Sequence, residues 1–71
     1  MEAVVLLGLN VRKFRKLRGM TQEQLGLDTE MERSYVSDLE RGTRNPSVRA
    51  VERLAKALEV ELHQLLMPLN D

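Results

Sequence analysis

The sequence predicts an all-α fold, a compact bundle of five short helices. Its 71 residues are enough for one domain and too few for a doubly wound sheet, a barrel or two domains. Apolar residues recur three or four positions apart, whereas no segment alternates with period two for long enough to suggest a strand. The helix-breaking residues that separate or follow the helical segments are Gly19, Gly42, Pro46 and Pro68.

The first helix is expected over residues 4–18. Leu7, Val11 and Phe14 recur at i, i+4 and i+7, which places them on one face directed at the core. Basic residues fill the other faces from Arg12 onward. We interpret them as a solvated surface, with phosphate contact by one or two of them as the alternative.

The second and third helices are short and adjacent, at about 21–29 and 32–41. Thr21 and Gln24 have the spacing of a capping box, in which the hydroxyl accepts from the backbone and the glutamine side chain reaches back. The third helix carries apolar residues at helical spacing, namely Tyr35, Val36 and Leu39.

The fourth helix begins after Pro46, with Ser47 as its N-cap. Its apolar stripe consists of Val48, Val51, Leu54, Ala55 and Leu58. A short fifth helix is expected at about 61–67. The sequence therefore predicts one domain over residues 1–71.

The composition excludes several classes of site. Without cysteine and with one histidine, His63, the chain offers no disulfide framework, no thiolate metal site and no histidine-rich zinc site. No nucleophile–base pair, carboxylate pair or glycine-rich phosphate loop stands out, so we expect no catalysis and no cofactor. No apolar stretch approaches the roughly 20 residues of a membrane span. We expect a cytoplasmic protein.

The charge pattern is more informative than the net charge, which is zero. Residues 10–27 and 41–56 each carry five basic residues and one acidic residue, whereas residues 28–40 carry one basic and five acidic residues. Two basic blocks therefore flank an acidic stretch. A local basic patch is sufficient for a nucleic-acid footprint, so balanced charge does not exclude this partner.

Residues 21–41 have the layout of a helix-turn-helix, in which the second helix enters the DNA major groove. Val36 and Leu39 would anchor that helix from its inner face. Its outer face offers hydrogen-bonding and charged side chains: Arg33, Ser34, Ser37 and Asp38.

Three segments resemble the lambda-repressor-like family of helix-turn-helix regulators, also called the Cro/CI or Xre type. They are residues 19–25, 33–42 and 44–47, and residues 54–60 fit the fourth helix of that family. Within the family, the Arg-Ser-Tyr-Val-Ser run is most similar to restriction–modification controller proteins, although small phage repressors and antitoxins share the pattern. The resemblance implies a prokaryotic or phage regulator of transcription, located at the nucleoid.

The resemblance also implies where the chain touches DNA. Gln22 matches a position that often binds a phosphate, and Tyr35 matches one that often lies against the sugar-phosphate backbone. Arg44 and Asn45 match a loop that approaches DNA. The positions that meet base edges are Arg33, Ser34, Ser37 and Asp38.

Two positions depart from the family pattern. Gly26 stands where the family usually has alanine, and it keeps the small volume needed for close helix approach. Glu30 stands where the family usually has glycine, so it would have to adopt a positive φ. We expect a strained or rearranged turn. Glu40 is expected to pair with a basic residue of the first helix.

The end of the chain has more apolar surface than so small a core requires. This segment either covers the core of the monomer or forms the interface of a two-fold symmetric dimer. The residues predicted to form a dimer interface are Leu62, Leu65, Leu66 and Met67. A homodimer would hold two reading helices roughly 34–36 Å apart on a near-palindromic operator. The sequence does not decide whether three further leucines extend the core or form another contact with a partner: Leu9, Leu17 and Leu27.

Two functions follow from these observations. The first is a sequence-specific, homodimeric DNA-binding regulator that blocks or recruits RNA polymerase, which makes the polymerase a further candidate partner. The second is an antitoxin or adaptor whose main partner is a protein. It is suggested by the acidic stretch around Glu30 and Glu32 and by the apolar tail.

Overall fold

The computed structural model describes residues 1–69 and contains four α-helices followed by a 3₁₀ helix. The helices are α1 (Ala3–Leu17), α2 (Gln22–Thr29), α3 (Arg33–Glu40) and α4 (Val48–Leu58), and the 3₁₀ helix is η1 (Leu62–Leu66). No strand occurs within this described range. The predicted all-α class is confirmed.

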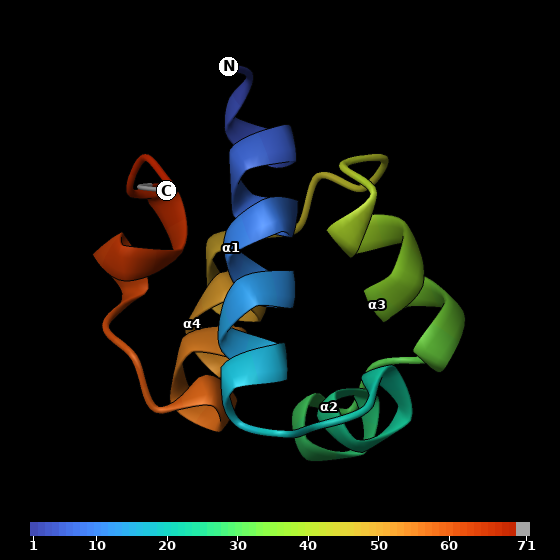
Figure 1. Cartoon of the computed structure of the whole chain (residues 1–71). Helices are drawn as coiled ribbons and strands as arrows, with labels where there is room; N and C mark the ends of the chain where they lie inside the picture. Colours follow the sequence, from blue (N-terminus) through green and yellow to red (C-terminus); the bar gives the residue numbers. More distant parts are fainter. Residues whose placement is uncertain (70–71) are drawn as a thin grey trace.

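Helix α1 forms the centre of the molecule (Figure 1). Helix α3 packs on one side of it, and η1 packs on the other. Helix α2 lies across the lower end and contacts both α3 and α4. Because α1 separates α3 from η1, a DNA contact through α3 and a protein contact through η1 would occupy different faces.

The fifth element differs from the prediction, because it is a five-residue 3₁₀ helix and not an α-helix. Glu61 before it and Met67 after it are both extended, with ψ of 150° and 146°. So few residues leave little room for an α-helical hydrogen-bond ladder, and short segments commonly take the tighter 3₁₀ form. Its start is still capped, since the Gln64 side chain accepts from the Glu61 backbone N–H at 2.8 Å.

The predicted helix starts are confirmed by their hydrogen bonds. Thr21 Oγ1 accepts from the Gln24 N–H at 3.0 Å, and Gln24 Oε1 accepts from the Thr21 N–H at 2.8 Å. At α4, Ser47 Oγ accepts from the Ala50 N–H at 3.1 Å. These bonds satisfy backbone donors that the first helical turn leaves free.

One contiguous core holds the helices together, with the helix-turn-helix packed on α1 and α4. Phe14 packs against it from the edge. Val48, predicted to join the apolar stripe of α4, is exposed because the first turn of that helix extends beyond the core. The buried apolar residues are Leu7, Val11, Leu25, Val36, Leu39, Val51, Leu54, Ala55, Leu58 and Leu65.

The turn between α2 and α3 has the geometry that the sequence predicted. Glu30 adopts the left-handed conformation, with φ 58° and ψ 39°. The chain then reverses tightly, and the Met31 N–H donates to the Gly26 carbonyl at 2.8 Å. A Cβ at Gly26 would lie only 2.6 Å from the Met31 carbonyl oxygen. Gly26 is thus needed for the close approach.

Within residues 1–69, no helix is both long enough and apolar enough to cross a membrane.

Candidate nucleic-acid interface

Helix α3 is anchored on one face and open on the other. Val36 and Leu39 are buried in the core, as predicted. Arg33 and Ser34 are exposed, and Tyr35 and Ser37 are half-buried. This arrangement presents arginine and hydroxyl groups at the start of a fixed helix.

A largely buried ion pair fixes the end of α3 to the rest of the domain. Arg15 Nε of α1 contacts Glu40 Oε2 at 2.6 Å, and its Nη2 donates to Oε1 at 3.1 Å. Arg15 also donates to the Met20 carbonyl at 2.8 Å. The predicted pairing of Glu40 with the first helix is confirmed, and it makes Glu40 a structural residue.

Gln22 joins the same network from the start of α2. Its Nε2 donates to Glu40 Oε1 at 3.1 Å, so one carboxylate ties α1, α2 and α3 together. The amide of Gln22 keeps a second N–H, because one NH₂ group carries two donors. The side chain that the sequence assigned to a phosphate is thereby held in a defined position.

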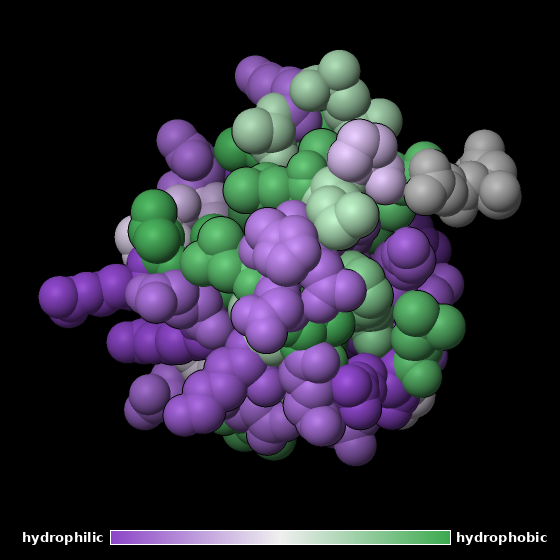
Figure 2. All heavy atoms as spheres, turned by 90° about the vertical axis from the view of Figure 1, so that its left-hand side faces the viewer, coloured by the Kyte–Doolittle hydropathy of each residue, from purple (hydrophilic) through white to green (hydrophobic). Residues whose placement is uncertain are grey.

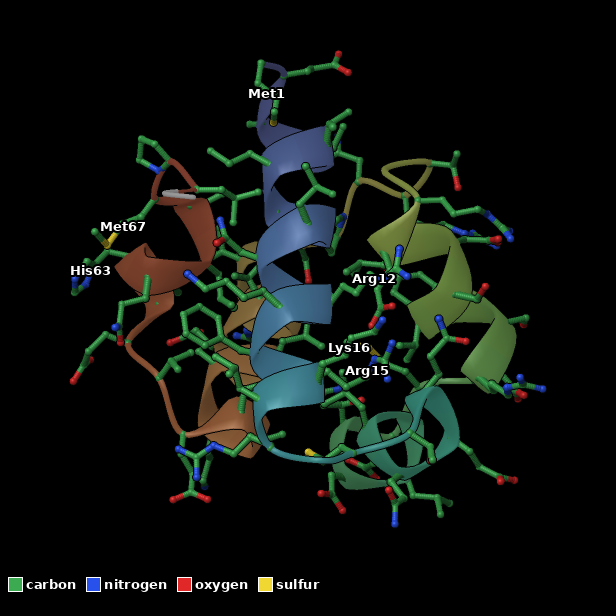
Figure 3. All side chains as sticks on the ribbon, viewed as in Figure 1. Met1, Arg12, Arg15, Lys16, His63 and Met67 are labelled. Carbon is green, nitrogen blue, oxygen red and sulfur yellow. The ribbon has the colours of Figure 1, made fainter. Side chains whose placement is uncertain are left out.

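A surface hollow of about 230 Å³ opens beside this network. Figure 3 shows Arg12 and Arg15 extending from the side of α1 that faces α3. Arg12 and Arg41 are exposed at this hollow. The sequence left phosphate contact as an alternative for the basic residues from Arg12 onward, without singling out Arg12, and it did not assign Arg41 to DNA. Arg12 lies one turn before Arg15, so helical spacing could have identified it. The lining residues are Arg12, Arg15, Gln22, Ser37, Glu40 and Arg41.

The outer end of α3 carries a second charged cluster, centred on Asp38. Its carboxylate accepts from Arg41 through Oδ1 and from Arg44 through Oδ2, the latter at 3.4 Å. The guanidinium of Arg44 lies 5.1 Å from the centroid of the Tyr35 ring. Arg33, by contrast, forms no ion pair with any residue between 1 and 69. Arg33 is therefore not paired with Asp38 of the same helix.

The loop after α3 continues the same surface. Arg44 and Asn45 are both exposed, and half-buried Pro46 follows them. Of the predicted DNA-contact residues, the structure thus groups Tyr35 and Asp38 of α3 around Arg44 of the loop. Gln22 and Ser37 line the hollow on its flank, and Arg33 and Ser34 stand at its start.

The residues predicted to form a dimer interface divide into two groups. Leu65 is 0% exposed and belongs to the core of the single chain, so its side chain is not on the surface as the prediction required. Leu62 is half-buried against the core. Leu66 and Met67 remain 43% and 47% exposed. The apolar spacing alone had not shown which side of this short element faces inward.

The face formed by η1 carries apolar surface in its upper half and mostly hydrophilic surface below (Figure 2). His63 and Met67 lie on this side, away from Arg12 (Figure 3). His63 is exposed. Elsewhere, Leu17 and Leu27 are exposed and Leu9 is half-buried, which places Leu17 and Leu27 outside the core.

Comparisons with known proteins agree with this geometry. The Helix-turn-helix family model matches residues 11–65. Control protein C.BamHI of Bacillus amyloliquefaciens is 43% identical over 63 residues, which cover 87% of this chain and 78% of that protein. The structure of the restriction-modification controller protein C.AhdI from Aeromonas hydrophila has a TM-score of 0.84 and 39% identity, covering 87% of this chain and 94% of that one.

A third comparison is with a DNA complex. The biofilm master regulator SinR, solved in complex with DNA, has a TM-score of 0.81 and 31% identity, covering 86% of this chain and 98% of that one. The family match includes α2, α3 and α4 in full and α1 from residue 11 onward. The chain therefore belongs to the helix-turn-helix family.

Proposed function

We propose that this chain is a sequence-specific DNA-binding regulator of transcription, of the restriction–modification controller type. The proposal rests on α3, whose exposed Arg33 and Ser34 stand on a helix that the Arg15–Glu40 pair holds in place. A fixed helix with exposed donors near its start is what the major groove accepts. The similarity to two controller proteins and to SinR supports this function.

In this proposal, α3 reads bases and its flanks bind phosphates. Arg33 donates two hydrogen bonds to O6 and N7 of a guanine, and Ser34 and Ser37 contact neighbouring bases or the backbone. Gln22, with the exposed cation Arg12 beside it, binds a phosphate on one flank. Arg44 and Asn45 contact the other strand from the loop that follows α3, together with Tyr35, whose ring the Arg44 guanidinium covers.

We further propose that the chain acts as a homodimer through η1. Leu66 and Met67 supply exposed apolar surface there, and Leu62 supports them. Helices α3 and η1 lie on opposite sides of α1 (Figure 1). In two copies joined at η1, each α3 therefore lies on the side of its copy that faces away from the dimer interface. The domain measures 27 × 22 × 19 Å, which suits helices one DNA turn apart, about 34 Å. Occupancy of the operator then blocks or recruits RNA polymerase in the cytoplasm.

An antitoxin or adaptor is the second candidate function, and one observation favours it. Leu27 is 76% exposed on a hollow of about 530 Å³ that is also lined by Glu23, Glu30 and Glu32. An apolar side chain among carboxylates suits a basic protein partner. The two functions differ in the surface that they use, since DNA binding depends on α3 and its basic flanks, whereas a basic protein partner would depend on Leu27 and the carboxylates of this hollow.

The proposed function is tested by selecting duplexes from a random pool and replacing Arg33. We expect Arg33→Ala to lose about 1–3 kcal/mol on the selected duplex and to relax the preference at one base pair. Affinity for a scrambled duplex should change little. Binding titrations at several salt concentrations measure both quantities.

Arg12→Ala is the matched control, because it removes the same side chain from an exposed site beside the phosphate-binding flank. It should weaken both duplexes alike and reduce the salt slope by about one. If the wild-type chain enriches no sequence and binds selected and scrambled duplexes equally, the proposed function is wrong.

A further inference from the structure

Asp38 occupies an unusual position for a residue on a DNA-reading helix, because its carboxylate lies between two arginines. Arg41 reaches it from the C-cap of α3, and Arg44 reaches it from the following loop. The side chain of Asp38 is 26% exposed, and those of the arginines are far more exposed. The single negative charge of Asp38 is therefore shared by two arginines, which remain accessible to solvent in the free protein.

The backbone of Asp38 also holds this loop. The Thr43 N–H and the Thr43 hydroxyl both donate to the Asp38 carbonyl, each at 3.0 Å. Arg44 is further restrained by its position over the Tyr35 ring. The Arg44 side chain is thus held in a defined position beside α3. A phosphate that approaches this side chain must compete with Asp38 for it.

Transfer of both arginines to phosphates would leave the carboxylate without a partner. An unpaired charge near DNA is unfavourable, because phosphates and most major-groove acceptors repel it. The major groove presents two amino donors, N4 of cytosine and N6 of adenine, and cytosine N4 is the usual partner of a carboxylate. A duplex with such a donor at that position, cytosine above all, compensates Asp38, and a duplex without one does not.

On the basis of the proposed function, we infer that Asp38 is a specificity-determining residue that works by exchange of partners. On the operator, Arg41 and Arg44 move to phosphates while Asp38 accepts a hydrogen bond from a base. On other sequences, Asp38 retains the arginines or stays uncompensated, so non-specific binding is suppressed. Asp38 and Arg44, which the sequence predicts as separate DNA contacts, thereby act as one unit.

The experiment uses Asp38→Asn in the full chain, with affinities for the selected and scrambled duplexes measured over a salt series. We expect affinity for the scrambled duplex to rise on the order of tenfold, because two exposed ion pairs no longer compete with phosphates. The slope of log affinity against log salt should steepen by about one to two. Affinity for the selected duplex should rise less or fall, so the ratio of the two affinities decreases.

Glu32→Gln is the matched control, because it removes one negative charge at the other end of α3. Glu32 is exposed and forms no ion pair with the residues between 1 and 69. We expect its affinities to change by less than about threefold. Thermal unfolding of each variant verifies that the fold is retained.

The other outcomes overturn the inference. Equal effects of Asp38→Asn and Glu32→Gln would mean that only net charge matters. Loss of operator affinity with unchanged scrambled-duplex affinity would make Asp38 an ordinary base contact. If the wild type prefers the selected duplex and Asp38→Asn leaves the ratio of selected to scrambled affinity unchanged, this inference alone is overturned. If the wild type has no preference for the selected duplex, the proposed function is overturned as well.

Discussion

Glu30 shows how much conformational strain one residue of the turn carries. Two non-glycine residues of the described chain, Glu30 and Glu59, have a φ of 58°. A side chain with a Cβ loses roughly 1 kcal/mol or more in this left-handed conformation. Glycine adopts it without that steric penalty. The turn keeps its shape because the close packing around Gly26 leaves the chain no alternative path.

Glu30→Gly should therefore stabilise the domain by about 1 kcal/mol. The gain comes from relief of the left-handed strain, reduced by the greater entropy of glycine in the unfolded chain. Urea denaturation measures the free energy of unfolding. Glu30→Ala is the control, because it removes the same carboxylate but keeps the Cβ. If alanine stabilises as much as glycine, charge and not backbone strain is responsible.

A buried side chain of α1, Asn10, ties the 3₁₀ helix η1 to α1 in addition to the core packing of Leu65. The Asn10 Nδ2 group donates to the Leu65 carbonyl at 3.0 Å and to the Met67 carbonyl at 2.8 Å. Asn10 is itself buried. These two bonds hold the segment that presents Leu66 and Met67 to solvent. The Asn10 side-chain amide thus links the position of η1 to the proposed dimer interface.

Asn10→Leu should destabilise the domain by about 2 kcal/mol, because it leaves two carbonyl groups without their donor. It should also weaken self-association, since η1 is no longer fixed. Urea denaturation gives the first quantity, and analytical ultracentrifugation gives the second. Asn45→Leu is the control for stability, because Asn45 is exposed and should change it by less than about 0.5 kcal/mol. Equal stabilities of the two variants would contradict the anchoring role.

The sequence predicted the elements better than it predicted their partners. Capping residues and breakers place helix ends, because Thr21 and Ser47 act on their own neighbours. The burial of Leu65 depends on contacts between elements, and the pairing of Asp38 with Arg44 depends on the path of the loop after α3, neither of which spacing shows. The pairing of Glu40 was foreseeable, since a carboxylate beside the core faced a basic helix.

Gly8 illustrates the same limit at a helix crossing. It lies in α1, and a Cβ added there would clash with the backbone carbonyl of Leu39 in α3. The sequence presents Gly8 only as one member of an apolar run. Its role depends on how closely two helices approach, which is a tertiary quantity.

The whole molecule separates its two proposed contacts onto different faces. Helix α3 and η1 lie on opposite sides of α1 (Figure 1). The net charge is zero, so one copy has little general attraction for DNA. Two linked copies gain from effective concentration, because the first contact brings the second reading helix to its half-site. Affinity should therefore depend on dimerisation more than on the charge of either copy.

Leu66→Glu should abolish the dimer and leave the monomer folded, because this leucine is exposed in the single chain. Affinity for a palindromic duplex should fall by on the order of 10²-fold, while affinity for a single half-site stays the same. Analytical ultracentrifugation and titration of the two duplexes measure these effects. Leu27→Glu, the same change at an exposed site away from η1, should remain dimeric. A Leu66→Glu chain that still dimerises would place the interface elsewhere. A dimeric wild type with no advantage on the palindrome would instead show that the two reading helices do not act together, even though the chain self-associates.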